Sequence, residues 1–125
     1  MTEQFDIQVE VDFAASHIIH GHPGKCANLH GHNWKVEVCV LTDCVNDIGI
    51  GIDFCDVKKP LKEIIEELDH QHLNDLPYFK DINPTAENLS RHIYSKLAEA
   101  LPEVDVQYVT LWETDRSRVT YRRAK

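Results

Sequence analysis

The N-terminal segment alternates apolar and polar side chains with a period of two residues, which places the two kinds on opposite faces of a β-strand. The apolar positions are Phe5, Ile7, Val9, Val11, Phe13 and Ala15. A second alternating segment covers residues 34–40, where the apolar positions are Trp34, Val36, Val38 and Val40. The two segments predict an antiparallel hairpin with one buried face, and a histidine-rich loop joins its strands.

Beyond Phe54 the apolar period becomes helical. Asp53 stands at a position suited to an N-cap, and the apolar face that follows consists of Val57, Leu61, Ile64, Ile65 and Leu68. A second helix is predicted to begin after residues 83–85 and to end at Pro102. Its apolar stripe consists of Leu89, Ile93, Leu97 and Leu101.

Residues 104–114 and 119–121 predict two further strands around a turn at 115–117. The predicted order is β-β-α-α-β-β, an α+β fold with an antiparallel sheet and two helices on one face. A length of 125 residues fits one domain, 1–125. A chain of this size does not easily enclose a large cleft alone, so we expect it to form a homo-oligomer.

Charge and cysteine content narrow the class of protein. The formal net charge of -8 argues against a general nucleic-acid binder, which needs a basic surface to meet phosphates. The first four residues show no basic region followed by an apolar one, so we expect neither a signal peptide nor a membrane anchor, and a cytoplasmic location. The four cysteines form no C-x-x-C pair, and we expect free thiols.

Five of the eight histidines fall between positions 17 and 32. His30 and His32 stand two apart, so in a strand both side chains lie on one face at about 6.6 Å spacing. His17, at the end of the neighbouring strand, could complete a set of three. Three protein ligands with an open position are typical of catalytic zinc. The cluster therefore predicts a metal site that activates a substrate oxygen.

Spacing alone does not choose among the five histidines. His20 and His22 also stand two apart, but Pro23-Gly24 follows them and indicates a turn. A place in a loop makes these two the weaker ligand candidates.

Three further groups carry chemistry: Asp69-His70, Cys26 and Glu113. Asp69-His70 stands at the end of the first predicted helix. Asp69 can orient the adjacent His70 and stabilise its charged form, although helix capping with solvent contact is an equal alternative. A thiol such as Cys26 becomes a usable base or nucleophile beside an imidazole and a metal. Glu113, near a strand end, is either a solvated edge residue or a double acceptor for adjacent N–H groups of a heterocycle.

Several motifs in this order are those of a known family. Residues 13–17 fit F-x-A-[AS]-H, residues 26–32 fit C-x-x-x-H-G-H, and residues 68–74 fit L-D-H-x-x-L-N. Residues 83–88 and Glu113-Thr114 extend the match nearly from end to end. The chain resembles the 6-pyruvoyltetrahydropterin synthase family, and most closely its bacterial branch, the 6-carboxytetrahydropterin synthases of queuosine biosynthesis.

The resemblance implies the tunnelling fold, in which subunits close their sheets into barrels and active sites lie between subunits, usually in a hexamer. It implies that 7,8-dihydroneopterin triphosphate is cleaved to 6-carboxy-5,6,7,8-tetrahydropterin, acetaldehyde and triphosphate. It also implies three sets of site residues: zinc ligands His17, His30 and His32; a proton-transfer group of Cys26, Asp69 and His70; and Glu113 as the anchor of the pterin ring.

The segment directly after His17 departs from the family pattern. Many relatives carry a basic residue after the first ligand histidine, where this chain has Ile18 and Ile19. Lys25 is a candidate contact for the triphosphate, with an exposed surface lysine as the alternative.

Two other functions remain open at this stage. The first is 6-pyruvoyltetrahydropterin synthase itself, which eliminates triphosphate and keeps the carbon side chain. The short spacing of three residues between Cys26 and His30 favours the bacterial branch instead. The second is a non-catalytic protein that binds zinc and a pterin, or a structural zinc module, and the presence of Cys26 and Asp69-His70 argues against it.

Overall fold

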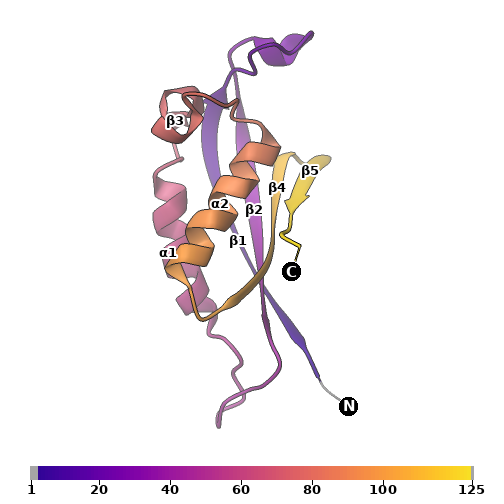
Figure 1. Ribbon diagram of the computed structural model, residues 1–125, viewed down its shortest axis with the longest axis vertical. Coiled ribbons are helices and arrows are strands. Elements are labelled where there is room, and N and C mark those ends of the chain that lie inside the picture. The colour runs from indigo at the N-terminus through magenta and orange to yellow at the C-terminus, as the bar shows by residue number, and fades with distance from the viewer. Residues whose placement is uncertain (1–2, 125) are drawn as a thin grey trace.

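Residues 3–124, which the computed structural model describes, form a five-stranded sheet with two α-helices on one face (Figure 1). The elements in chain order are β1 (Phe5–His17), β2 (His30–Thr42), α1 (Phe54–Glu66), β3 (Gln71–His72), α2 (Ala86–Ala100), β4 (Asp105–Thr114) and β5 (Ser117–Tyr121). The predicted α+β class is confirmed. The predicted absence of a leader segment rests partly on Met1 and Thr2, which lie outside the described residues.

The strands lie in the order β3-β1-β2-β4-β5. Every neighbouring pair is antiparallel except β1 and β3, which pair in parallel at Ala15 and Ser16. The sequence did not predict β3, because two residues are too few to show a period. The β1–β2 register places Phe13 opposite Trp34 and His17 opposite His30.

The alternating apolar positions form the core between the sheet and the helices. α1 packs on β1, and α2 packs on β4 and β5. Trp34, Val36, Val38 and Val40 are all fully buried, as the period of two in β2 predicts. Buried positions of the helices that meet them include Leu61, Ile65, Leu89, Ile93 and Leu97.

Both helices begin at a side-chain cap. Asp53 accepts a hydrogen bond from the Cys55 amide at 2.8 Å, and Thr85 accepts one from the Asn88 amide at 3.1 Å. The end of α1 differs from the prediction, because the helix stops at Glu66 and not at Asp69-His70. Those two residues lie in the turn that leads to β3, where the Asp69 amide donates a hydrogen bond to the carbonyl of Ile65 at 2.9 Å.

The β4–β5 pairing contains a bulge at Glu113. Trp112 pairs with Arg118 and Thr114 pairs with Ser117, which leaves Glu113 as the extra residue of β4. Bulges turn a side chain away from the direction that regular alternation would give it. Within residues 3–124, neither helix is long and apolar enough to cross a membrane.

Candidate metal centre

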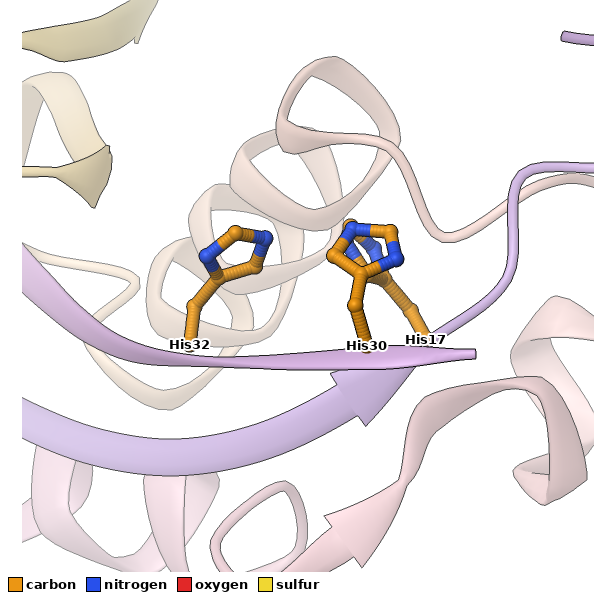
Figure 2. Close-up of side chains that lie close together, drawn as sticks. All are labelled: His17, His30 and His32. Atoms are coloured by element: carbon orange, nitrogen blue, oxygen red, sulfur yellow. The ribbon is translucent and has the colours of Figure 1, made fainter. Parts of the chain in front are cut away.

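His17, His30 and His32 converge at one end of the β1–β2 hairpin. In the β1–β2 register, His17 lies opposite His30, and Ala15 lies opposite His32. Figure 2 shows the three rings on the same side of the two strands, with α2 behind them. One ligand nitrogen from each ring can be chosen so that all three lie within 4.8 Å of one another, and in the described part of the chain no other His, Cys, Asp or Glu group does this.

The site holds two buried nitrogen atoms that lack a partner. His17 is fully buried, and its Nε2 has no hydrogen bond among residues 3–124, nor has the Nε2 of His32. An unsatisfied buried polar atom costs about 1–3 kcal/mol. Two such atoms side by side fit a metal ion, which would use both lone pairs.

The other ring nitrogens of His17 and His30 meet backbone carbonyls. His17 Nδ1 lies 2.8 Å from the oxygen of Pro84, and His30 Nδ1 lies 2.7 Å from the oxygen of Asn28. A carbonyl oxygen only accepts, so both Nδ1 atoms carry the proton, and in the neutral rings each Nε2 carries a lone pair. Histidines that bind metals usually donate their second nitrogen in this way.

Burial favours the neutral form of the His17 and His32 rings. Loss of solvent is the main cause that lowers the pKa of His17 and of His32, and the neighbouring imidazoles lower both further. Metal binding requires the neutral ring, because a protonated nitrogen offers no lone pair. The lowered pKa values therefore leave the lone pairs of His17 and His32 available to a metal ion.

Trp34 holds two of the rings in place. It is fully buried and meets His17 and His32 edge to face, with ring centroids 5.1 Å and 5.2 Å apart. Its indole N–H donates to the oxygen of Ala15 at 3.2 Å. The packing of Trp34 thus orients both rings, as a precise metal site requires.

Glu113 is the fourth side chain at this site. Its Oε1 lies 3.6 Å from His32 Nε2, and its Oε2 lies 4.0 Å from His17 Nε2. The bulge in β4 places it there, beside the imidazoles and 30% exposed. A solvated edge residue, one of the two sequence interpretations, does not describe this position.

The sequence profile of the family described as 6-pyruvoyl tetrahydropterin synthase matches residues 6–124. The chain belongs to this family.

Relatives within the 6-pyruvoyl tetrahydropterin synthase family carry two different enzyme names. A 6-pyruvoyl tetrahydrobiopterin synthase of Poecilia reticulata is 42% identical over 103 residues, covering 79% of this chain and 70% of that protein. A 6-carboxy-5,6,7,8-tetrahydropterin synthase of Aquifex aeolicus is 37% identical over 123 residues, covering 78% of this chain and 76% of that protein.

The fold agrees with that of a solved member. The structure of Caenorhabditis elegans 6-pyruvoyl tetrahydropterin synthase matches with a TM-score of 0.88 at 27% identity and covers 98% of each chain. The predicted tunnelling fold is confirmed. The chain is an enzyme of this family, of the pterin synthase type.

The family motif that contains Asp69 and His70 lies at the edge of β1, away from β2. The Asp69 carboxylate accepts a hydrogen bond from the Ala14 amide at 2.9 Å and lies 2.9 Å from His70 Nδ1. The Ala14 bond, with a smaller effect of His70, lowers the pKa of Asp69. The His70 side chain is 82% exposed, and His70 has a φ of 58°, a left-handed conformation that is uncommon outside glycine.

Cys26 lies elsewhere in the single chain. It is half-buried in a 3-10 turn, Lys25–Ala27, within the β1–β2 loop. No hydrogen bond between described residues joins its thiol to Asp69 or His70. The structure thus brings the three histidines and Glu113 together, and no hydrogen bond or ion pair among the described residues joins them to the Asp69-His70 pair, whose imidazole is exposed.

His20 and His22 stay out of the cluster, as their loop position predicted. Both are exposed, and His22 Nδ1 accepts from the Gly24 amide at 2.9 Å. Lys25 is exposed as well, which leaves its contact with triphosphate an untested expectation.

Asn74 and Asn83 hold the segment after His17 in place through side-chain hydrogen bonds to its backbone. Neither asparagine was predicted from the sequence to be a site residue. The Asn74 side chain bonds to both the amide and the carbonyl of Ile18, at 2.8 Å and 2.9 Å. Asn83 does the same for His20, at 2.9 Å and 2.8 Å. Both asparagines stand in motifs of the family, and that position in a motif was the only available signal.

Proposed function

We propose that this chain is a zinc-dependent lyase that converts 7,8-dihydroneopterin triphosphate and water to 6-carboxy-5,6,7,8-tetrahydropterin, acetaldehyde and triphosphate. The observation that carries the proposal is the set of three histidines whose free nitrogens converge while the second nitrogens of His17 and His30 donate to carbonyls. Three neutral nitrogen ligands are the pattern of catalytic zinc in proteins.

His17, His30 and His32 would hold the zinc through one ring nitrogen each. When bound, zinc supplies a Lewis acid that polarises an oxygen of the substrate side chain. Three neutral ligands leave the charge of the ion undiminished, which lowers the cost of removing a proton from the adjacent carbon.

Cys26 and His70 would move protons on that side chain. In this proposal the Cys26 thiolate acts as a base, and Asp69 holds the imidazole of His70 in one orientation through its Nδ1. The left-handed backbone of His70 supports a functional role, because strained conformations of this kind gather at functional sites. Glu113 would accept two hydrogen bonds from the N–H groups of the pterin ring.

We also propose that the active site lies between subunits of a homohexamer. The outer edge of β1 meets β3 only at Ala15 and Ser16, so among described residues no strand pairs with that edge over residues 5–13. Unpaired edges invite pairing with another chain. β1 exposes Asp6, Glu10 and Asp12, whereas the opposite edge strand and its C-terminal flank expose Arg118 and Arg122.

This assembly would bring together the groups of the proposed active site that lie apart in the single chain. The exposed Asp69-His70 pair of one subunit could then serve the metal centre and Cys26 of its neighbour. Measurement of the mass in solution tests it, since a hexamer contains six copies of the 14.4 kDa chain. A monomer with full activity would contradict it.

A role in queuosine biosynthesis in the cytoplasm belongs to the same proposal. All four cysteines of the sequence are free, which suits a reducing compartment. The assignment to queuosine biosynthesis depends on the product, because 6-carboxytetrahydropterin would be an intermediate of that pathway.

The second candidate function is that of a 6-pyruvoyl tetrahydropterin synthase, because relatives with that name reach 42% identity. The two enzymes differ in one observable, the carbon side chain of the pterin. Mass spectrometry of the pterin formed from 7,8-dihydroneopterin triphosphate separates them. A pterin with a one-carbon carboxylate supports the first proposal, and a pterin that keeps all three side-chain carbons transfers the assignment to the second.

A further inference from the structure

Glu113, at the bulge in β4, lies closer to the histidine cluster than a role as anchor of the pterin ring alone would require. The carboxylate lies against the two buried nitrogens that lack partners, 3.6 Å from that of His32 and 4.0 Å from that of His17. No hydrogen bond links these atoms at those distances. Glu113 therefore faces the proposed metal ligands directly.

The His17 contact brings together two acceptors. Because Nδ1 of His17 donates to Pro84, the Nε2 of the neutral ring carries a lone pair. The Glu113 carboxylate carries lone pairs too, and neither atom can donate to the other. The His17 side chain is fully buried and that of Glu113 is 30% exposed, so the two facing acceptors repel each other with little solvent between them, and a cation near both would remove that repulsion.

The distances fit shared coordination. Ligand atoms about 2.0 Å from a tetrahedral ion lie roughly 3.3 Å from one another. The two separations of 3.6 Å and 4.0 Å exceed that value by less than an ångström. Glutamate is an accepted zinc ligand, and its three rotatable bonds allow a shift of that size.

We propose that Glu113 is the fourth ligand of the metal in the substrate-free protein, and that a heterocycle with two adjacent N–H donors draws it off the metal. This inference rests on the proposed function of the histidine cluster. The exchange opens one coordination position at the moment when the pterin ring arrives, so a substrate oxygen can occupy it. The metal and the ring then compete for one carboxylate.

Competition of this kind is reciprocal. If the ring weakens the hold of Glu113 on the metal, the ring must lower metal affinity by the same factor by which the metal lowers ring affinity. A residue that only anchors the ring gives no such coupling. Metal affinity in the absence of substrate therefore distinguishes the two roles.

The first experiment measures cobalt(II) binding by Glu113→Gln in competition with a chelator. Loss of a carboxylate ligand should weaken binding at least about tenfold and change the visible absorption of the bound cobalt. Asp115→Asn is the matched control, because it removes the same charge from an exposed position two residues away. The control should bind cobalt as the wild type does.

The second experiment adds pterin without a side chain to the cobalt-loaded protein. We expect the wild-type spectrum to shift towards that of Glu113→Gln, and the spectrum of the variant to stay unchanged. Cobalt affinity and spectrum of Glu113→Gln equal to those of the wild type would overturn this inference.

Failure of this inference can be told apart from failure of the proposed function. If Glu113→Gln binds cobalt normally and the wild type still releases acetaldehyde, only the ligand role of Glu113 is wrong. If the wild-type protein binds no cobalt or zinc, both conclusions fall.

Discussion

His17 Nδ1 donates a hydrogen bond of 2.8 Å to the carbonyl oxygen of Pro84, 67 residues further along the chain. This bond joins the end of β1 to the segment that leads into α2. It fixes the tautomer of the ring and points the lone pair of Nε2 into the cluster of imidazoles. The metal centre is therefore built into the contact between sheet and helix.

The first prediction concerns the ligands. Purified protein should carry about one zinc per chain, and His17→Ala, His30→Ala and His32→Ala should each lose most of it, because each removes one of three ligands. His20→Ala and His22→Ala are controls that remove exposed imidazoles and should keep zinc. Full zinc by elemental analysis in a His30→Ala, His32→Ala double variant would show that the metal binds elsewhere.

A second prediction concerns pH. Burial lowers the pKa of His17 and His32 below the ordinary value of 6.5, so the unfolded chain binds protons that the metal-free folded chain does not. Stability is then complete above pH 6.5 and falls as the pH drops through the lowered values. Urea unfolding of metal-free protein should show this loss.

The same measurement on His32→Gln supplies the control, since that variant lacks one of the titrating groups. Burial also lowers the pKa of His92, which contributes in the same window in both proteins. A dependence on pH equally steep in His32→Gln and in the wild type would argue against the role of His32.

The third prediction separates chemistry from binding. Cys26→Ala should keep zinc and pterin binding and lose turnover by about 100-fold to 10,000-fold, because only proton transfer is removed. Asp69→Asn should reduce turnover less than His70→Ala, since an amide oxygen can still accept from Ala14 and orient the imidazole. Unimpaired turnover by folded, zinc-loaded Cys26→Ala would exclude the thiol from the reaction.

A fourth prediction concerns the clamp after His17. Asn74→Ala removes two hydrogen bonds to Ile18 and should lower the free energy of unfolding by about 1–3 kcal/mol and weaken zinc binding as well. Asn46→Ala is the matched control, because the Asn46 side chain also makes two hydrogen bonds to the backbone, both as an acceptor, in the loop between β2 and α1. The control should lose stability without losing zinc, as measured by urea unfolding and metal titration.

The sequence predicted the strands and helices that are long enough to show a hydrophobic period. Alternation through Phe13 and Ala15 placed His17 at a strand end, and the spacing of His30 and His32 placed both on one face. β3 was missed because Gln71-His72 is shorter than any period, and the first helix was extended too far because Leu68 continues its apolar stripe.

The contacts that complete the site could not be predicted from local pattern. The Pro84 carbonyl and the Asn74 clamp join residues 67 and 56 positions apart, and no local signal indicates such pairs. The bulge that turns Glu113 towards the histidines depends on how β5 pairs with β4. Family motifs indicated the importance of these positions without indicating what they touch.

The central claim is that the histidine cluster holds a zinc ion needed to cleave the side chain of the pterin substrate. The most direct measurement is the acetaldehyde trapped from 7,8-dihydroneopterin triphosphate by one preparation as purified, after removal of metal, and after zinc is restored. We predict aldehyde from the first, almost none from the second and recovery in the third. Undiminished aldehyde from the metal-free protein would contradict the account, as would turnover that releases triphosphate and never aldehyde.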